Sequence, residues 1–166
     1  SSRHMSAKSI IKRTIEESVD MLFDNARAVP ADKRSWKPAE GTRSVLEVCQ
    51  ECAQAPGWSA AMITDRAVRF EAGVDMNEDS WTAAQKEREA WTTIEECERV
   101  CRERTAGLLK AIDAFPEADM DQTLFLPFTG KDHPYWDIMM YPYWNATWHT
   151  GQIAYVQTML GDQEMH

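Results

Sequence analysis

The chain has 166 residues, enough for one domain with a buried core. Its 27 acidic and 18 basic residues give a net charge of −9 without a lysine- and arginine-rich stripe, which argues against binding to nucleic acid. No run of about 18 apolar residues and no signal-peptide pattern occurs, so we expect a cytoplasmic protein with no membrane partner. We expect residues 1–5 to be a cloning scar, residues 6–161 a single domain and residues 162–166 a C-terminal tail.

The first predicted helix covers residues 8–28, because apolar residues recur along it every three or four positions. A second helix is expected over residues 43–70, and Ser44 with Glu47 has the spacing of a capping box near its start. The Pro-Gly pair at 56–57 predicts a kink or a brief break. The expected core of these helices consists of Ile11, Ile15, Ser18, Val19, Leu22, Ala26, Val45, Val48, Cys52, Met62, Ile63 and Val68.

Residues 71–86 are predicted to form a loop with a short helical turn near Trp81. The third helix is expected to begin at Thr92 or Thr93 and to end at Ala114. Thr92 and a glutamate three residues later have the spacing of a capping box. Apolar residues at bundle spacing then predict a helix that buries Trp91, Ile94, Cys101, Leu108 and Ile112.

Residues 117–134 form a long connection, which could fold as a short hairpin or as a lid over one end of the bundle. The fourth helix is expected over residues 134–161, kinked near Pro142 and stopped by Gly161 in the position after the helix end. The pattern therefore predicts an all-α four-helix bundle with long connections between its consecutive helices. Sites in such bundles are built in the core from facing helices.

Four cysteines occur in two pairs, Cys49 with Cys52 and Cys97 with Cys101. Such pairs could indicate a metal site or a redox pair. Both pairs fall inside strong helical patterns, where free cysteine behaves as a small apolar core residue. We expect all four to pack in the core.

Asn145 and His149 are the polar residues of interest in the last helix. They stand four residues apart, so their side chains lie on one face of a helix, one turn above the other. That face also carries Ile138, Gln152 and Val156 and is expected to point inward, where an unpaired polar group costs about 1–3 kcal/mol. By contrast, a histidine beside Pro134, His133, is expected to face solvent.

Two segments resemble the DinB-like four-helix-bundle superfamily: WKPAEGTRSVLEVCQEC at 36–52 and WNATWHTGQIAYVQTMLG at 144–161. The strongest match is the run from His149 to Ile153. The resemblance implies a divalent metal held by three histidines, one from the second helix and two from the last. The resemblance aligns the three metal-binding histidines with Glu51, Asn145 and His149 of this sequence, so only the third position is still a histidine. Glu51 itself is expected at a helix edge with its carboxylate in water.

Three interpretations of this altered site remain open. Glu51, Asn145 and His149 could bind a divalent zinc, nickel, manganese or iron ion, with Glu51 and His149 catalytic. They could instead form a metal-free hydrogen-bonded cluster, either structural or capable of acid–base chemistry. In the third interpretation the site binds an organic ligand against an aromatic wall of Trp136, Tyr141, Trp144 and Trp148.

The resemblance suggests two kinds of enzyme, a thiol-linked transferase and a metal-dependent hydrolase. The partner would be a small-molecule substrate, such as a low-molecular-weight thiol, and the resemblance also implies a homodimer. The competing hypothesis is a non-catalytic ligand-binding or stress-associated bundle that has lost the family's metal site.

Overall fold

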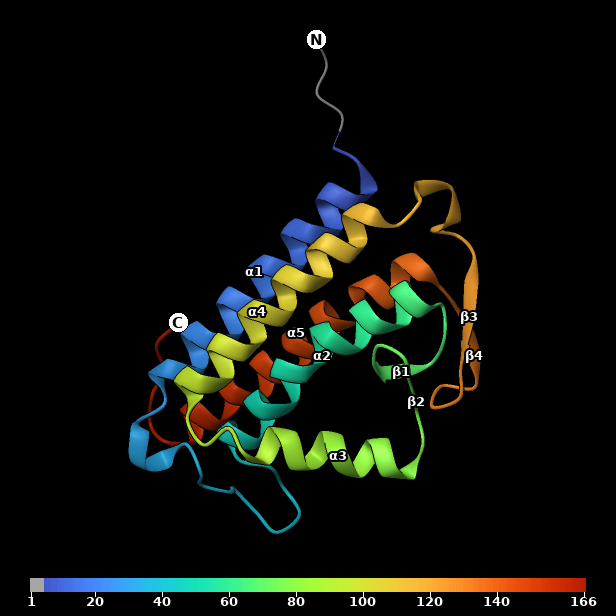
Figure 1. The fold of residues 1–166 in the computed structure, drawn as a ribbon. Coiled ribbons are helices and arrows are strands. Elements are labelled where there is room, and N and C mark those ends of the chain that lie inside the picture. The colour runs from blue at the N-terminus through green and yellow to red at the C-terminus, as the bar shows by residue number, and fades with distance from the viewer. Residues whose placement is uncertain (1–4) are drawn as a thin grey trace.

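The computed structural model describes residues 5–166, so all but the last residue of the expected cloning scar lies outside the described residues. Five α-helices and two small antiparallel sheets occur in this part of the chain (Figure 1). The helices are α1 (Ala7–Ala28), α2 (Val45–Asp65), α3 (Glu78–Glu89), α4 (Ile94–Ala114) and α5 (Tyr135–Met159). One hairpin consists of β1 (Arg69–Glu71) and β2 (Val74–Asp75), and the other of β3 (Thr123–Leu126) and β4 (Lys131–Pro134). Short 3-10 helices cover Ala31–Lys33 and Glu117–Asp119.

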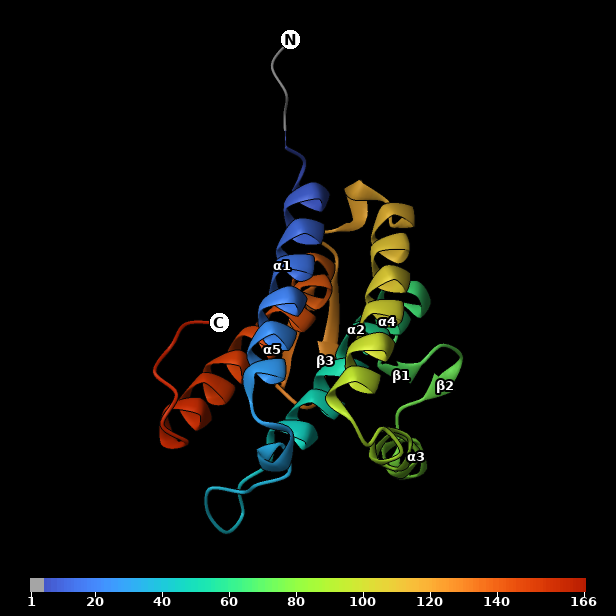
Figure 2. The ribbon, with the colours of Figure 1, turned by 90° about the vertical axis from the view of Figure 1, so that its left-hand side faces the viewer.

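The long helices α1, α2, α4 and α5 pack around a common core. The helix α2 lies between α4 and α5, and α1 closes the arrangement by packing on both of these helices (Figures 1 and 2). The shorter α3 lies outside this group, against α2 and β1. The prediction of a mainly helical protein is therefore confirmed, whereas α3 and the β1–β2 hairpin lie where mostly loop was expected.

The helix α2 is shorter than predicted at its C-terminal end. It ends at Asp65 because Arg66 adopts a left-handed backbone conformation, with φ of +52°. The Arg66 side chain is held by Asp119 at 2.8 Å and lies over the ring of Phe115, 4.4 Å from its centroid. The last residues of the predicted helix, Arg69 and Phe70, belong to β1 instead.

Pro56 lies inside α2, and the helix continues through it without a break. Proline has no N–H group, so the carbonyl of Cys52 one turn earlier loses its helical partner. The Cys101 thiol donates to that carbonyl at 3.6 Å. This contact from α4 satisfies the carbonyl that the proline leaves free.

The helix starts agree with the capping signals in one case and differ in the other. Ser44 and Glu47 form the predicted capping box, with the Glu47 amide donating to Ser44 Oγ at 3.1 Å. The predicted box of Thr92 is wrong, because Thr93 caps α4 and accepts from the Glu96 amide at 3.1 Å. At the end of α5 the predicted stop is confirmed, since Gly161 follows the C-cap with φ of +91°.

Between α4 and α5, the predicted hairpin is confirmed. Its strands pair from Thr123 with Pro134 to Leu126 with Lys131, and its turn places Gly130 at φ of +69°. The hairpin runs alongside the bundle in Figure 1, next to the start of α5. It is therefore positioned to cover side chains of α2 and α5.

The buried core contains the predicted apolar residues with one exception. Val68 is only half-buried, because it follows the shortened α2. All four cysteines are buried and free, as expected of core residues. Burial raises the pKa of each thiol, to about 12 at Cys97 and Cys101, so the reactive thiolate is disfavoured at all four positions.

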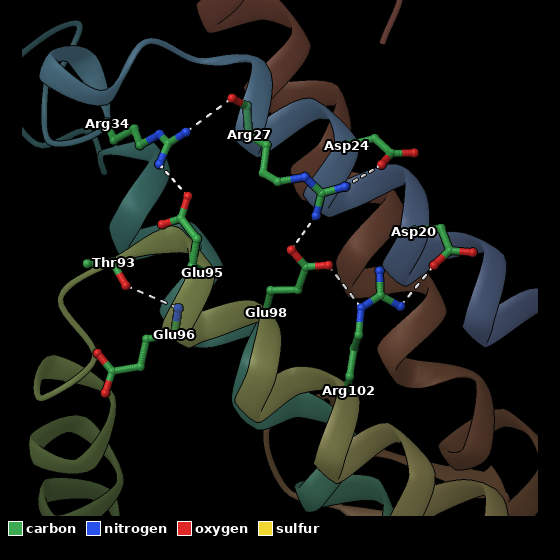
Figure 3. A network of polar contacts seen from close by, with 9 residues as sticks. All are labelled: Asp20, Asp24, Arg27, Arg34, Thr93, Glu95, Glu96, Glu98 and Arg102. Atoms are coloured by element: carbon green, nitrogen blue, oxygen red, sulfur yellow. Dashed lines mark hydrogen bonds and ion pairs between the residues drawn. The ribbon is translucent and has the colours of Figure 1, made fainter.

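An ion-pair network joins α1 to α4 on the outside of the bundle (Figure 3). Glu98 of α4 accepts from Arg27 of α1 and from Arg102 at 2.9 Å, and Arg102 also contacts Asp20 at 2.9 Å. Burial of the Glu98 carboxylate opposes its ionisation. The hydrogen bonds from Arg27 and Arg102 outweigh that effect and hold the pKa of Glu98 below its ordinary value. The network fixes α1 beside α4.

Candidate functional site

Glu51 and His149 meet across the interface between α2 and α5. The Oε2 atom of Glu51 lies 2.8 Å from Nε2 of His149. The His149 side chain is only 6% exposed, and that of Glu51 is 23% exposed. The expectation that the Glu51 carboxylate extends into water is thus wrong, because the carboxylate turns to a histidine 98 positions away in the sequence.

Two further side chains complete this polar cluster, and the sequence analysis identified neither as a site residue. Arg43, just before the cap of α2, approaches Glu51 Oε2 at 3.4 Å and His149 Nε2 at 3.5 Å. On the other side of the ring, Gln152 Oε1 lies 2.6 Å from His149 Nδ1. We call Arg43, Glu51, His149 and Gln152 the polar cluster.

The charges in the polar cluster stabilise an ionised Glu51. The hydrogen bond from His149 lowers the pKa of Glu51, the nearby Arg43 charge acts in the same direction, and desolvation opposes both. His149 has an acceptor at each ring nitrogen, a carboxylate oxygen and an amide oxygen.

Asn145 lies close to the polar cluster but is not bonded to it. Its amide nitrogen donates to Cys52 Sγ at 3.6 Å, and the residue is half-buried. The expected partnership of Asn145 with Glu51 and His149 is therefore absent from the hydrogen bonds of the described residues.

The donor set fits a divalent metal poorly. A metal at this site would have to replace the hydrogen bond between His149 Nε2 and Glu51 Oε2. Arg43 places a positive charge within 3.5 Å of both would-be ligand atoms, and Asn145 offers only an amide. The only group of three potential metal ligands found among residues 5–166 lies elsewhere, at Asp162, Glu164 and His166 near the C-terminus, with ligand atoms within 4.8 Å of one another.

A cavity of about 430 Å³ adjoins the polar cluster, with Glu51 on its wall. It lies between α2, α5, the start of α3 and the two hairpins. Tyr141 and Trp144 line it as predicted, whereas Trp136 and Trp148 are not among its lining residues. The aromatic side chains that line it are Trp58, Phe70, Trp81, Phe128, Tyr141 and Trp144.

Four of these rings form a continuous wall. Trp58 packs against Phe70 and Tyr141, with centroid distances of 5.6 and 6.3 Å, and Phe70 packs against Trp81 at 5.4 Å. Burial and the nearby Glu51 charge raise the pKa of Tyr141 to about 12, so its phenol remains neutral. The sequence analysis missed Trp58, although its position seven residues after Glu51 puts it on the same helix face.

His133 lines the same cavity, so the expectation that it faces solvent is wrong. Its Nδ1 atom lies 2.7 Å from Asp137 Oδ2, and its Nε2 atom lies 2.6 Å from Thr129 Oγ1. These contacts link the turn of the β3–β4 hairpin to the first turn of α5. They hold the hairpin over the cavity.

Solved structures share this fold at low sequence identity. A DinB-like protein from Bacillus subtilis has a TM-score of 0.64 at 13% identity, over 94% of each chain. A protein described as the sibling lethal factor precursor DfsB has a TM-score of 0.68 at 15% identity, over 96% of this chain and 99% of its own. The mycothiol-dependent maleylpyruvate isomerase has a TM-score of 0.65 at 8% identity, over 88% of this chain and 60% of the isomerase.

No protein-family profile and no curated protein matches the sequence. The structural likeness confirms the fold that the sequence motifs suggested, which is that of the DinB-like proteins. Within residues 5–166, no helix is both long enough and apolar enough to cross a membrane.

Proposed function

We propose that this chain, which has the DinB-like fold, binds a small apolar molecule in the cavity beside the polar cluster and does so without a metal. The aromatic cavity is the observation that carries the proposal. Its volume of about 430 Å³ lies in the range of small-molecule sites, which are mostly apolar with a few polar groups. Glu51, His133 and Asp137 supply those polar groups.

The charges on the cavity wall restrict the ligand further. Among the lining residues there is no lysine or arginine, while Glu51 and Asp137 contribute two carboxylates. An anionic ligand would have only His133 as a counter-charge, so a neutral or cationic molecule fits better. For the same reason a thiolate is a poor match, which disfavours the thiol-linked transfer suggested by the family resemblance.

The metal-free part of the proposal predicts that the purified protein contains no stoichiometric metal. Zinc, nickel, manganese and iron(II) should leave its thermal midpoint unchanged. An ion that did bind would be detected, because at 100 times its Kd it would add about 2.7 kcal/mol of stability. Elemental analysis and a thermal-shift screen test this expectation. Stoichiometric metal that disappears in Glu51→Ala and His149→Ala would support the metal-dependent transferase or hydrolase instead.

A restored triad provides the positive control for that measurement. The variant E51H/N145H combines two new histidines with His149 in the arrangement that the family resemblance implies. We expect this variant to take up zinc or nickel, especially when Arg43→Ala removes the neighbouring positive charge. If the variant takes up metal and the parent chain takes up none, the residues at positions 51 and 145 account for the absence of metal binding in the parent chain.

The ligand itself is tested with three probes of similar size and different charge. Phenethylamine is a cation at neutral pH, 2-phenylethanol is neutral and phenylacetate is an anion. We expect quenching of tryptophan fluorescence by the first two and a binding constant at least about tenfold weaker for the third, a difference of about 1.4 kcal/mol. Equal binding of all three would contradict the argument from charge, and binding of none would contradict the proposed cavity function.

A further inference from the structure

Three side chains on the wall of the aromatic cavity are linked by consecutive hydrogen bonds. His133 Nε2 lies 2.6 Å from Thr129 Oγ1, and His133 Nδ1 lies 2.7 Å from Asp137 Oδ2. A hydroxyl, an imidazole and a carboxylate in this order are the groups that activate an oxygen nucleophile in many hydrolases. We call Thr129, His133 and Asp137 the cavity triad, because all three line the cavity.

Asp137 determines where a neutral His133 carries its proton. A carboxylate oxygen accepts hydrogen bonds, so Nδ1 of His133 donates to Oδ2 of Asp137. The lone pair of the ring then lies on Nε2, which faces the Thr129 hydroxyl and can accept its proton. The side chains of His133 and Asp137 are 20% and 32% exposed, so their contact is partly shielded from water. This arrangement meets the geometric requirement for a general base.

The turn of the β3–β4 hairpin fixes the position of the Thr129 hydroxyl. The amides of Thr129 and Gly130 both donate to the carbonyl of Leu126, at 3.1 and 2.9 Å. The hydroxyl itself lies 3.2 Å from this carbonyl and 2.6 Å from His133 Nε2. A hydroxyl has one proton to donate, and the shorter contact favours the histidine. Thr129 is also exposed, so a substrate in the cavity can reach it.

The remaining wall of the cavity restricts the substrate. The inference rests on the proposed function, in which the cavity binds a small apolar molecule without negative charge. A neutral aromatic ester meets that description, and its hydrolysis releases a carboxylate. Glu51 and Asp137 on the wall repel a carboxylate and so favour its release. Tyr141, one helical turn after Asp137, adds a neutral hydroxyl that can donate to the oxyanion formed during hydrolysis.

We infer that the cavity triad hydrolyses small neutral carboxylic esters, with Thr129 as nucleophile, His133 as general base and Asp137 as positioning residue. Thr129 Oγ1 bonds to the carbonyl carbon while its proton passes to His133 Nε2. The bond from that carbon to the alcohol oxygen then breaks, and His133 gives the proton to the departing oxygen. The products of this step are a free alcohol and an acyl ester on Thr129.

Water completes the reaction at the same atoms. His133 Nε2 takes a proton from water, and the water oxygen bonds to the acyl carbon. The bond between this carbon and Thr129 Oγ1 breaks, and the proton returns to Oγ1. One ester and one water thus give one alcohol and one carboxylic acid, and the cavity triad ends in its starting state.

Thr129→Val tests the nucleophile, because valine replaces the hydroxyl with a methyl group of similar shape. The parent protein should hydrolyse 2-phenylethyl acetate, and with 4-nitrophenyl acetate it should carry an acetyl group on the peptide that contains Thr129. Thr129→Val should lose this acetyl group and lower kcat/KM by at least about 100-fold. Thr129→Ser keeps a hydroxyl and should retain both. Circular dichroism verifies that each variant is folded.

Asp137→Asn tests the positioning residue. Asparagine can still bond to His133, but its neutral amide does not stabilise the imidazolium that forms when His133 accepts a proton. We expect kcat to fall by at least about 100-fold with KM unchanged, whereas a purely structural contact would leave kcat unaffected. The matched control is His166→Gln, because His166 pairs with Asp162 at 2.7 Å but lies outside the cavity lining. This control should hydrolyse esters at the parent rate.

The outcomes separate this inference from the proposed binding function. Binding of 2-phenylethanol without hydrolysis of either ester would overturn the inference and leave the binding function intact. Hydrolysis that persists in Thr129→Val, that falls equally in His166→Gln or that a metal chelator abolishes would also overturn it. Neither binding nor hydrolysis by the parent protein would contradict both.

Discussion

Glu51→Ala should lower the free energy of unfolding by about 1–3 kcal/mol at neutral pH, the cost of leaving a buried hydrogen-bonding group without its partner. The variant removes the acceptor of His149 Nε2 and the counter-charge of Arg43. Urea denaturation measures the change. The control is Glu103→Ala, because Glu103 is 66% exposed and pairs only with the exposed Arg99, so its loss should cost less than about 1 kcal/mol.

The same variant has a predicted pH dependence. The pKa of Glu51 is lower in the folded chain than in the unfolded one, so its ionised form stabilises the fold. That stabilisation is complete above the unfolded pKa, near 4.3, and is lost as the pH falls through the lower folded pKa. The stability difference between parent and Glu51→Ala should therefore shrink on acidification below about pH 4. A difference that is independent of pH would show that the Glu51 charge does not contribute.

Trp58→Ala should weaken binding of the apolar probes by at least about tenfold, because burial of a large apolar side chain contributes about 1.5–3 kcal/mol. Trp58 contacts both Phe70 and Tyr141 and so lies at the middle of the aromatic wall. Calorimetric titration measures the affinity, and circular dichroism verifies that the variant is folded. Trp136→Ala is the matched control, since Trp136 does not line the cavity.

Unchanged probe affinity in folded Trp58→Ala, or equal losses in both tryptophan variants, would place the binding site elsewhere. A loss in Trp58→Ala alone would distinguish this cavity from the aromatic wall predicted from sequence. That wall relied on Trp136 and Trp148 as well as on Tyr141 and Trp144. Only the last two line the cavity.

The helices that were predicted accurately are those whose buried face and capping residues can be recognised from residues close together in the sequence. The α1 stripe from Ile11 to Ala26 is buried as expected, and the Ser44 cap of α2 lies within three residues of its partner Glu47. By contrast, α3 contains no buried residue, so the apolar periodicity that reveals a helix is absent from it. The end of α2 was missed because Arg66 adopts the left-handed conformation there, whereas the sequence signal for such a helix end is glycine or asparagine.

For the candidate site, the sequence by itself determined that Asn145 and His149 share a helix face, because helical geometry fixes that spacing. The motif match placed Glu51 with them, and Glu51 and His149 are indeed in contact. Only the tertiary structure brought Arg43 to this pair and turned Asn145 toward Cys52. The contacts of Arg43 with His149 and of Asn145 with Cys52 join residues about 100 positions apart in the chain, and no local pattern encodes them.

The sequence also determined that α5 is a long, aromatic-rich helix with Asp137 as its one acidic residue and with Gly161 just past its end. The face predicted to point inward is buried at Ile138, His149 and Val156, but Gln152 on the same face is exposed. The sequence did not show how far the buried surface extends around the helix, because apolar residues occur on both faces. Packing against α1 and α2 decided that Ile138, Ala146 and Ile153 are buried. The same packing left Trp148 and Tyr155 exposed on the outer face.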